Sequence, residues 1–400
     1  MTSNSLRWLG AAIACWAATA PVHADTFKFE LLHVFHHTPN SVEGAWPAGP
    51  VQVLPDGDVI GTTERGGTYG GGTVFLVTAK GELKVLHEFT GRDGLYPESC
   101  LVPTKSGDFY GTARGTHHVV FRINSRADFA VVHRFQVPTG TIPYVVSVKG
   151  SDGKIYSVSD RRDGGFQLLS AGERAAAQPD VFSGLSNTVP GGQILLNAAH
   201  NGNQGSEVGT SSVSICADAV VGVDGHIYKT DPNMLSIMRS VEPGANKSVG
   251  EIFNPLKMTE DQRKLAGARG QMAVLPGGDL VGITHWQLPG EQSSGVFRVS
   301  PLGNVAWVSA FAKSMPVQSY SGLLLSSDGK MYGLVSHYGP EPITLLQVTT
   351  DGAVSNVLSF PSQARSPGAL TLGPDGALYG TFGGYGDGTS GAVFKIVQQR

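Results

Sequence analysis

The sequence predicts an all-β fold, namely a seven-bladed β-propeller in which each blade has four strands. A turn dipeptide followed by apolar and aromatic residues recurs at seven places along the 400-residue chain. Apolar residues almost nowhere follow helical spacing, whereas short strand-like phrases are frequent. The chain also begins with a phrase, Phe29–Phe35, whose near-copies come last in the repeating unit.

The copies of the turn phrase stand about 53 residues apart on average, close to the length of a four-stranded propeller blade. Asp-Gly and its Ser-Gly and Gly-Gly variants suit two-residue hairpin turns, because Gly readily adopts the positive φ that such turns need. The seven copies are Asp56–Thr63, Ser106–Ala113, Asp152–Ser159, Asp224–Asp231, Gly277–Thr284, Asp328–Val335 and Asp375–Phe382.

Each turn joins the first and second strands of a unit. A third strand follows a loop, as in Gly72–Val77, and a fourth strand ends in Phe, as in Leu83–Phe89. A histidine that recurs within the fourth-strand phrase is predicted to be structural, as is the Tyr that recurs in the second strand. The recurring histidines are His33, His87 and His133.

The first and last strands predict how the repeat array closes. The seventh unit stops at Arg400 after its third strand, while the N-terminus carries the fourth-strand phrase Phe29–Phe35 without the rest of its unit. We therefore expect Phe29–Phe35 to pair with Ala392–Ile396. Such pairing closes the ring and leaves no unpaired strand edge between the first and last blades.

The first 24 residues resemble a secretory signal peptide. Arg7 precedes the short apolar run Trp8–Ala20, and Val22–Ala24 suits cleavage before Asp25. The apolar run is too short for a membrane span. We expect export to the periplasm or the exterior and one propeller domain over residues 25–400, with lipidation at Cys15 as the open alternative.

The composition of the chain argues against some classes of function. The formal net charge is −3 and no basic stripe is present, which argues against a nucleic-acid partner. The 54 glycines and 15% charged residues suit a rigid, turn-rich body rather than disorder. Cys100 and Cys216, which remain after the leader, are either free thiols or one disulfide. We expect a monomer without a metal or other cofactor.

Two stretches carry a resemblance to a known family. Asp375–Ile396 ("DGALYGTFGGYGDGTSGAVFKI") and Asp56–Val77 resemble the GloVer-type tandem repeat, whose pattern is DG-x-LYGTT, a Gly-rich loop, GTVFK and a strand ending in Phe. The resemblance implies a β-propeller among the exported bacterial, choice-of-anchor proteins. It implies no established reaction and no catalytic residues.

Function is expected where units depart from their own consensus. In a propeller, the loops between second and third strands share one face with the connections to first strands, and we call this the loop-rich face. Two insertions, residues 186–214 and 254–270, are also expected there. The polar and aromatic residues that the repeat does not require are Arg114, His117, His118, Asn201, Arg269, His285, Trp286, His337, Tyr338 and Tyr385.

Three functions fit these residues. The first is binding of carbohydrate or another envelope or extracellular ligand on the loop-rich face, through Trp286, Tyr338, Tyr385 and the Asn-rich insertion 186–214 that contains Asn201. The second is a lyase that cleaves an acidic, uronate-containing glycan by β-elimination, with His285, His337 and Tyr338 exchanging protons. Its carboxylate-binding residues would be Arg114, His117, His118 and Arg269. The third is a non-catalytic protein-interaction scaffold.

Overall fold

The computed structural model describes only part of the chain. The described residues are 26–36, 42–47, 49–97, 101–115, 119–134, 145–149, 155–160, 166–171, 219–221, 227–231, 236–239, 271–288, 291–300, 305–311, 317–337, 341–386 and 390–399. All regular elements in these ranges are strands. Within them, no helix is long and apolar enough to cross a membrane. The predicted leader, both insertions, Cys100 and Cys216 lie outside the described residues.

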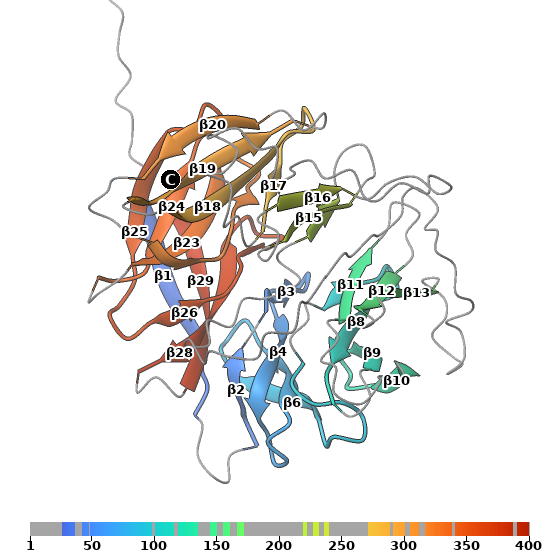
Figure 1. The fold of residues 1–400 in the computed structure, drawn as a ribbon. Helices are drawn as coiled ribbons and strands as arrows, with labels where there is room; N and C mark the ends of the chain where they lie inside the picture. The colour runs from blue at the N-terminus through green and yellow to red at the C-terminus, as the bar shows by residue number, and fades with distance from the viewer. Residues whose placement is uncertain are drawn as a thin grey trace, which may run out of the picture.

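The described strands form seven antiparallel sheets, numbered here in chain order (Figure 1). Sheet one holds β2 (Gly44–Pro47), β3 (Gln52–Val53), β4 (Val59–Gly66), β5 (Thr73–Val77) and β6 (Leu83–Glu88). Sheet two holds β7 (Val102–Pro103), β8 (Asp108–Ala113), β9 (Val119–Asn124) and β10 (Ala130–Arg134). Sheet three holds β11 (Val145–Lys149), β12 (Ile155–Asp160) and β13 (Phe166–Ala171).

The remaining sheets follow the same order. Sheet four holds β14 (Ala219–Val221), β15 (Ile227–Asp231) and β16 (Ser236–Arg239). Sheet five holds β17 (Ala273–Val274), β18 (Leu280–Leu288), β19 (Glu291–Val299) and β20 (Val305–Ala310). Sheet six holds β21 (Val317–Tyr320), β22 (Leu324–Leu325), β23 (Met331–His337), β24 (Thr344–Val348) and β25 (Val354–Ser359). Sheet seven holds β26 (Arg365–Pro367), β27 (Thr371–Leu372), β28 (Leu378–Tyr385), β29 (Ser390–Gln399) and the N-terminal β1 (Thr26–Val34).

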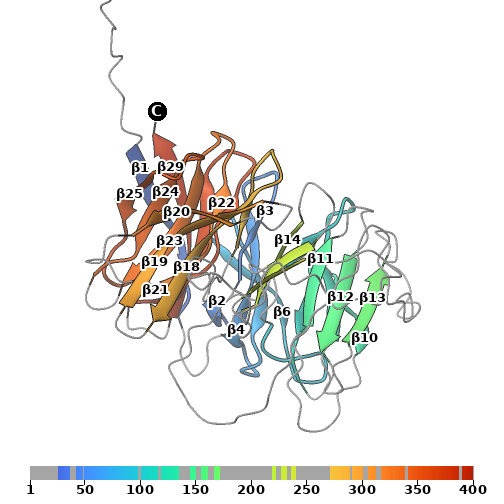
Figure 2. The ribbon, with the colours of Figure 1, turned by 45° about the horizontal axis from the view of Figure 1, so that its top comes forward.

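The N-terminal strand pairs with the C-terminal strand, which confirms the predicted pairing. In β1, Phe29 lies opposite Ile396 and Val34 lies opposite Ala392. Figure 2 shows β1 beside β29, although the two are the first and last strands of the chain. Thr26 pairs with Gln399, so both described chain ends lie at the same end of sheet seven.

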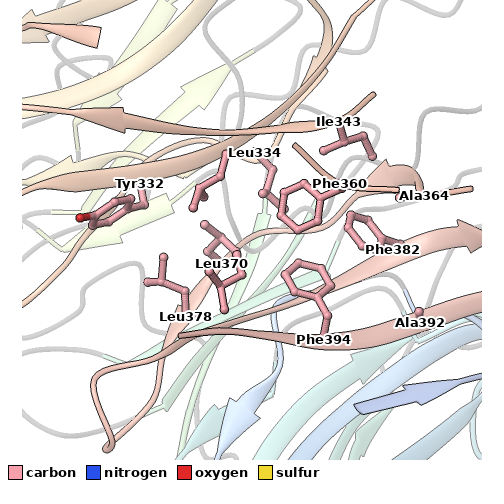
Figure 3. Packing of buried hydrophobic residues seen from close by; sticks show 12 residues of the cluster. Tyr332, Leu334, Ile343, Phe360, Ala364, Leu370, Leu378, Phe382, Ala392 and Phe394 are labelled. Atoms are coloured by element: carbon pink, nitrogen blue, oxygen red, sulfur yellow. The ribbon is translucent and has the colours of Figure 1, made fainter. Parts of the chain in front are cut away.

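The hydrophobic core lies between neighbouring sheets. One cluster joins sheet six to sheet seven, and within it Phe360, Phe382 and Phe394 pack together (Figure 3). Phe29 of β1 adds its ring to this cluster, 5.2 Å from Phe360 between centroids. Similar clusters join sheet one to sheet two and sheet five to sheet six. A further cluster joins sheet one to sheet seven, bringing the two ends of the repeat array together.

The structure explains why particular residues recur in the repeat motif. The second Gly of the repeat phrase lies under the ring of the Phe in the third strand: a Cβ at Gly380 would stand 2.5 Å from Phe394 Cζ. Gly61 and Gly282 face Phe75 and Phe297 in the same way. Because a methyl group has no room there, these units combine Gly in the second strand with Phe in the third. The turn glycines take positive φ, as predicted, at Gly57, Gly107, Gly278, Gly329 and Gly376.

The recurring Tyr and His residues whose side chains the structure describes pack between or within sheets, in agreement with their predicted structural role. The Tyr379 ring is buried, and its hydroxyl donates to Asp375 Oδ2 of the turn at 3.0 Å. His87 stacks on Phe129 of the next sheet with ring centroids 3.5 Å apart. Burial lowers the pKa of the His87 imidazole, although Asp93 at 2.9 Å acts in the opposite direction.

The Gly–Phe contact generates a stability prediction. The substitution Gly380→Ala should lower the free energy of unfolding by about 1–3 kcal/mol, because the added methyl group would clash with the Phe394 ring. Gly277 is the matched control, since a Cβ there meets no atom within 4 Å. Gly277→Ala should leave the stability unchanged or slightly raised. Chemical denaturation of both variants measures the difference, and equal midpoints would contradict the packing argument.

Candidate functional site

The candidate site lies at the strand ends opposite the Asp-Gly turns, on sheets one and two. At this end of sheets one, two and seven, three residues precede a proline and have positive φ although none is glycine: Trp46 at 57°, Tyr96 at 50° and Ser366 at 50°. A residue before proline normally has an extended backbone, and a bulky side chain at positive φ is uncommon and costs about 1–3 kcal/mol. The same unfavourable conformation therefore recurs in sheets one, two and seven.

In sheets one and two, the proline after the aromatic residue packs against the preceding sheet. Pro97 packs onto the start of the third strand of the preceding sheet, where a Cβ at Gly72 would stand 2.7 Å from Pro97 Cδ. Pro47 packs likewise onto Gly391 of sheet seven, where an added Cβ would stand 2.7 Å from Pro47 Cγ. The Gly of the "GTVF" phrase thus accommodates the proline of the next unit. The residue before that proline adopts a left-handed backbone conformation, with positive φ.

The aromatic side chains at these positions are not required by the backbone. Ser366 adopts the same conformation in sheet seven with a small polar side chain. Tyr96 is 40% exposed, and Tyr69, in the loop between β4 and β5, is 64% exposed. An exposed ring at a strained position, as at Tyr96, is typical of a surface that binds a ligand, and Tyr69 adds an exposed ring without that strain.

An arginine accompanies the aromatic residue in both sheets. The Arg65 guanidinium lies 4.8 Å from the centre of the Trp46 ring, and its side chain is 53% exposed. By register, Arg65 lies opposite Ala45, and Arg114 lies opposite Leu95, the residue before Tyr96. In sheet seven, where Ser366 replaces the aromatic residue, the corresponding partner of Arg365 is Gly384.

The loop that carries Tyr69 is held by hydrogen bonds. The Thr68 amide donates to Glu88 Oε2 at 2.5 Å, and the Gly67 amide donates to the Glu43 carbonyl at 2.9 Å. The Tyr96 amide donates to the Gly71 carbonyl at 2.7 Å, so the loop of sheet one is tied to the first-strand connection of sheet two. A surface ordered in this way loses less conformational entropy when a ligand binds.

The predicted site residues on the described side chains lie at the ends of second strands. Arg114 follows β8 and is half-buried. Tyr385 ends β28, and its half-buried ring stacks on Phe382 with centroids 6.3 Å apart. His337 ends β23 and is 6% exposed, with Nε2 3.3 Å from Thr344 Oγ1. Arg114, Tyr385 and His337 lie at the ends of second strands in three different sheets, two, seven and six.

For the remaining predicted residues, the structure describes either the backbone alone or nothing. His285 and Trp286 were expected directly after their second strand, yet they lie inside β18, because its ladder with β19 continues to Leu288 opposite Glu291. Only their backbone is described. The predicted residues outside the described part of the chain are His117, His118, Asn201, Arg269 and Tyr338. In the described part, no three His, Cys, Asp or Glu side chains gather as ligands for a metal.

Sequence reasoning missed the aromatic residues before proline. The signal is visible in the phrases "GAWP" (Gly44–Pro47) and "GLYP" (Gly94–Pro97), which stand at the same distance before their turns. The positive φ at the aromatic residue depends on the neighbouring sheet, and no short sequence window shows it.

Comparisons with known proteins agree with the fold. The chain is similar to virginiamycin B lyase from Staphylococcus aureus, solved as an inactive variant with quinupristin, at a TM-score of 0.52 and 13% identity, covering 93% of this chain and 99% of that one. It is also similar to an oligogalacturonate lyase in complex with manganese, at a TM-score of 0.51 and 12% identity, covering 94% and 97%. At these identities the likeness shows a propeller-like all-β fold alone.

Sequence comparison supplies the family for the first part of the chain. No curated protein is a significant match. The model of the Gloeobacter/Verrucomicrobia repeat matches residues 21–168, where the turn phrase, the Gly–Phe contact and the proline packing have just been described. Residues 21–168 of this chain therefore carry Gloeobacter/Verrucomicrobia (GloVer-type) repeats.

Proposed function

We propose that this chain is a carbohydrate-binding β-propeller that uses its loop-rich face. The observation that carries the proposal is the set of aromatic rings at the strand ends of sheets one and two, of which Tyr69 and Tyr96 are well exposed. Aromatic rings present an apolar face to a ligand and a polar edge to water, which suits the C–H faces and hydroxyl groups of sugars. The oligogalacturonate lyase among the structural relatives is consistent with a carbohydrate ligand.

We further propose that the seven sheets close into one ring of seven blades. Pairing of β1 with β29 and the cluster between sheet one and sheet seven support closure, since both join the first and last parts of the chain. A closed ring places the strand ends opposite the Asp-Gly turns on a common rim.

Ring closure predicts coupled stability. Phe29→Ala should remove a large part of the β1 anchor and speed amide exchange in both sheet seven and sheet one, because closure couples the two. Lys28→Ala, at an exposed position of the same strand, should have little effect. Hydrogen-exchange mass spectrometry reads each sheet separately. Faster exchange confined to sheet seven would show that the ring is open.

Carbohydrate binding is tested with a glycan array followed by calorimetry. Tyr69→Ala should weaken binding at least fivefold, because the exposed ring loses its contact with sugar. Leu31→Thr is the control, since Leu31 is an exposed apolar residue on β1, outside the candidate site. No binding to any glycan would overturn the proposal and favour the third predicted function, a protein-interaction scaffold.

Lyase chemistry on an acidic glycan stays a prediction. Its proposed proton-transfer residues are His285, His337 and Tyr338, and of these only the His337 side chain is described. If the prediction holds, His337→Ala should lower the rate at which unsaturated uronate product appears by at least tenfold. Ultraviolet absorbance follows that product, and an unchanged rate would exclude His337 from the reaction.

Export also stays a prediction, because the leader lies outside the described residues. The proposed secreted or periplasmic protein begins at Asp25, and mass spectrometry of the mature N-terminus tests it. A protein that retains Met1 would contradict cleavage.

A further inference from the structure

We infer that Trp46 with Arg65, and Tyr96 with Arg114, form two equivalent subsites for neighbouring residues of an acidic, uronate-containing glycan. This inference rests on the proposed carbohydrate-binding function and adds the class of ligand and the residues that select it. Three independent features carry it: the backbone at the aromatic residues, the arginine beside each one, and the repetition of the pair on successive sheets.

The first feature is that the aromatic side chains stand where the backbone disfavours them. In sheets one and two the following proline packs on the preceding sheet, and Ser366 shows that a small side chain is compatible with the same backbone conformation. Gly would relieve the strain altogether. An aromatic ring at such a position in two successive units, partly exposed to solvent, points to a surface that contacts a ligand.

The second feature is the arginine. Arg65 and Arg114 hold the same place relative to the aromatic residue, and the unit with Ser366 has Gly384 there. A guanidinium is always charged and binds a carboxylate through two parallel hydrogen bonds. Glu64 lies 3.8 Å from Arg65, but Arg65 remains half-exposed and such surface pairs are weak, so a ligand carboxylate can share this cation.

The third feature is repetition. The two pairs lie on adjacent sheets that are connected by the hydrogen bond from the Tyr96 amide to the Gly71 carbonyl. Each pair offers a ring for the apolar face of a sugar and a cation for its carboxylate. A polymer that repeats both features, one uronate after another, matches a protein surface that repeats them. Tyr69, in the loop between the two pairs in the chain, adds a further exposed ring.

The experiment measures calorimetric binding of tetragalacturonate and of the neutral cellotetraose to the full chain. Wild type should bind the acidic tetramer more tightly, with an affinity that falls as salt rises. Trp46→Ser and Tyr96→Ser should each weaken binding of the acidic tetramer about tenfold. Arg65→Gln and Arg114→Gln should weaken binding of the acidic tetramer but leave that of the neutral one. Arg126→Gln, on an exposed turn at the opposite strand ends, is the charge-matched control.

The outcomes separate the two proposals. Glycan binding that depends on Tyr69 but is unaffected by both Arg variants leaves the proposed function intact and overturns this inference. Absence of binding to both tetramers also overturns it, and the glycan array then decides the proposed function. Thermal denaturation accompanies each variant. If Trp46→Ser or Tyr96→Ser fails to fold, the aromatic positions are structural, which overturns the argument from strain.

Discussion

The packing of one sheet against the next is the constraint on which the rest of the structure depends. Antiparallel sheets of this size bury enough surface only when their faces meet, and here the described core clusters each span two sheets. The contact of Gly380 with the Phe394 ring shows how close the packing is within a sheet. The residues of the repeat motif are therefore those that form contacts within a sheet and between neighbouring sheets.

The same packing creates the candidate site. Pro47 and Pro97 lie against the glycines that begin the third strands of the preceding sheets, and the residue before each proline turns into the left-handed region. At these positions the proline packs against the neighbouring sheet, whereas the side chain before the proline differs from unit to unit. Variation at a position with a fixed backbone is how a repeat protein changes its binding surface without changing its fold.

The site predicted from the sequence and the candidate site on sheets one and two overlap only partly. Arg114 was predicted and lies opposite Leu95, the residue before Tyr96, whereas Trp46, Tyr69 and Tyr96 were missed. His337 was predicted from its departure from the repeat, yet its side chain is buried next to Thr344. Departure from a consensus identifies residues that the repeat does not need, but it does not tell whether they face solvent or a neighbouring strand.

The sequence by itself determined the strand order, the hairpin turns and the partner of the N-terminal strand. These follow from local rules: Gly at a tight turn, alternation along a strand, and a fourth-strand phrase without the rest of its unit. Only the tertiary structure decided the conformation of Trp46 and Tyr96, the burial of His337 and the length of β18. The physical reason is that each depends on atoms of a neighbouring strand or sheet, far away in the chain.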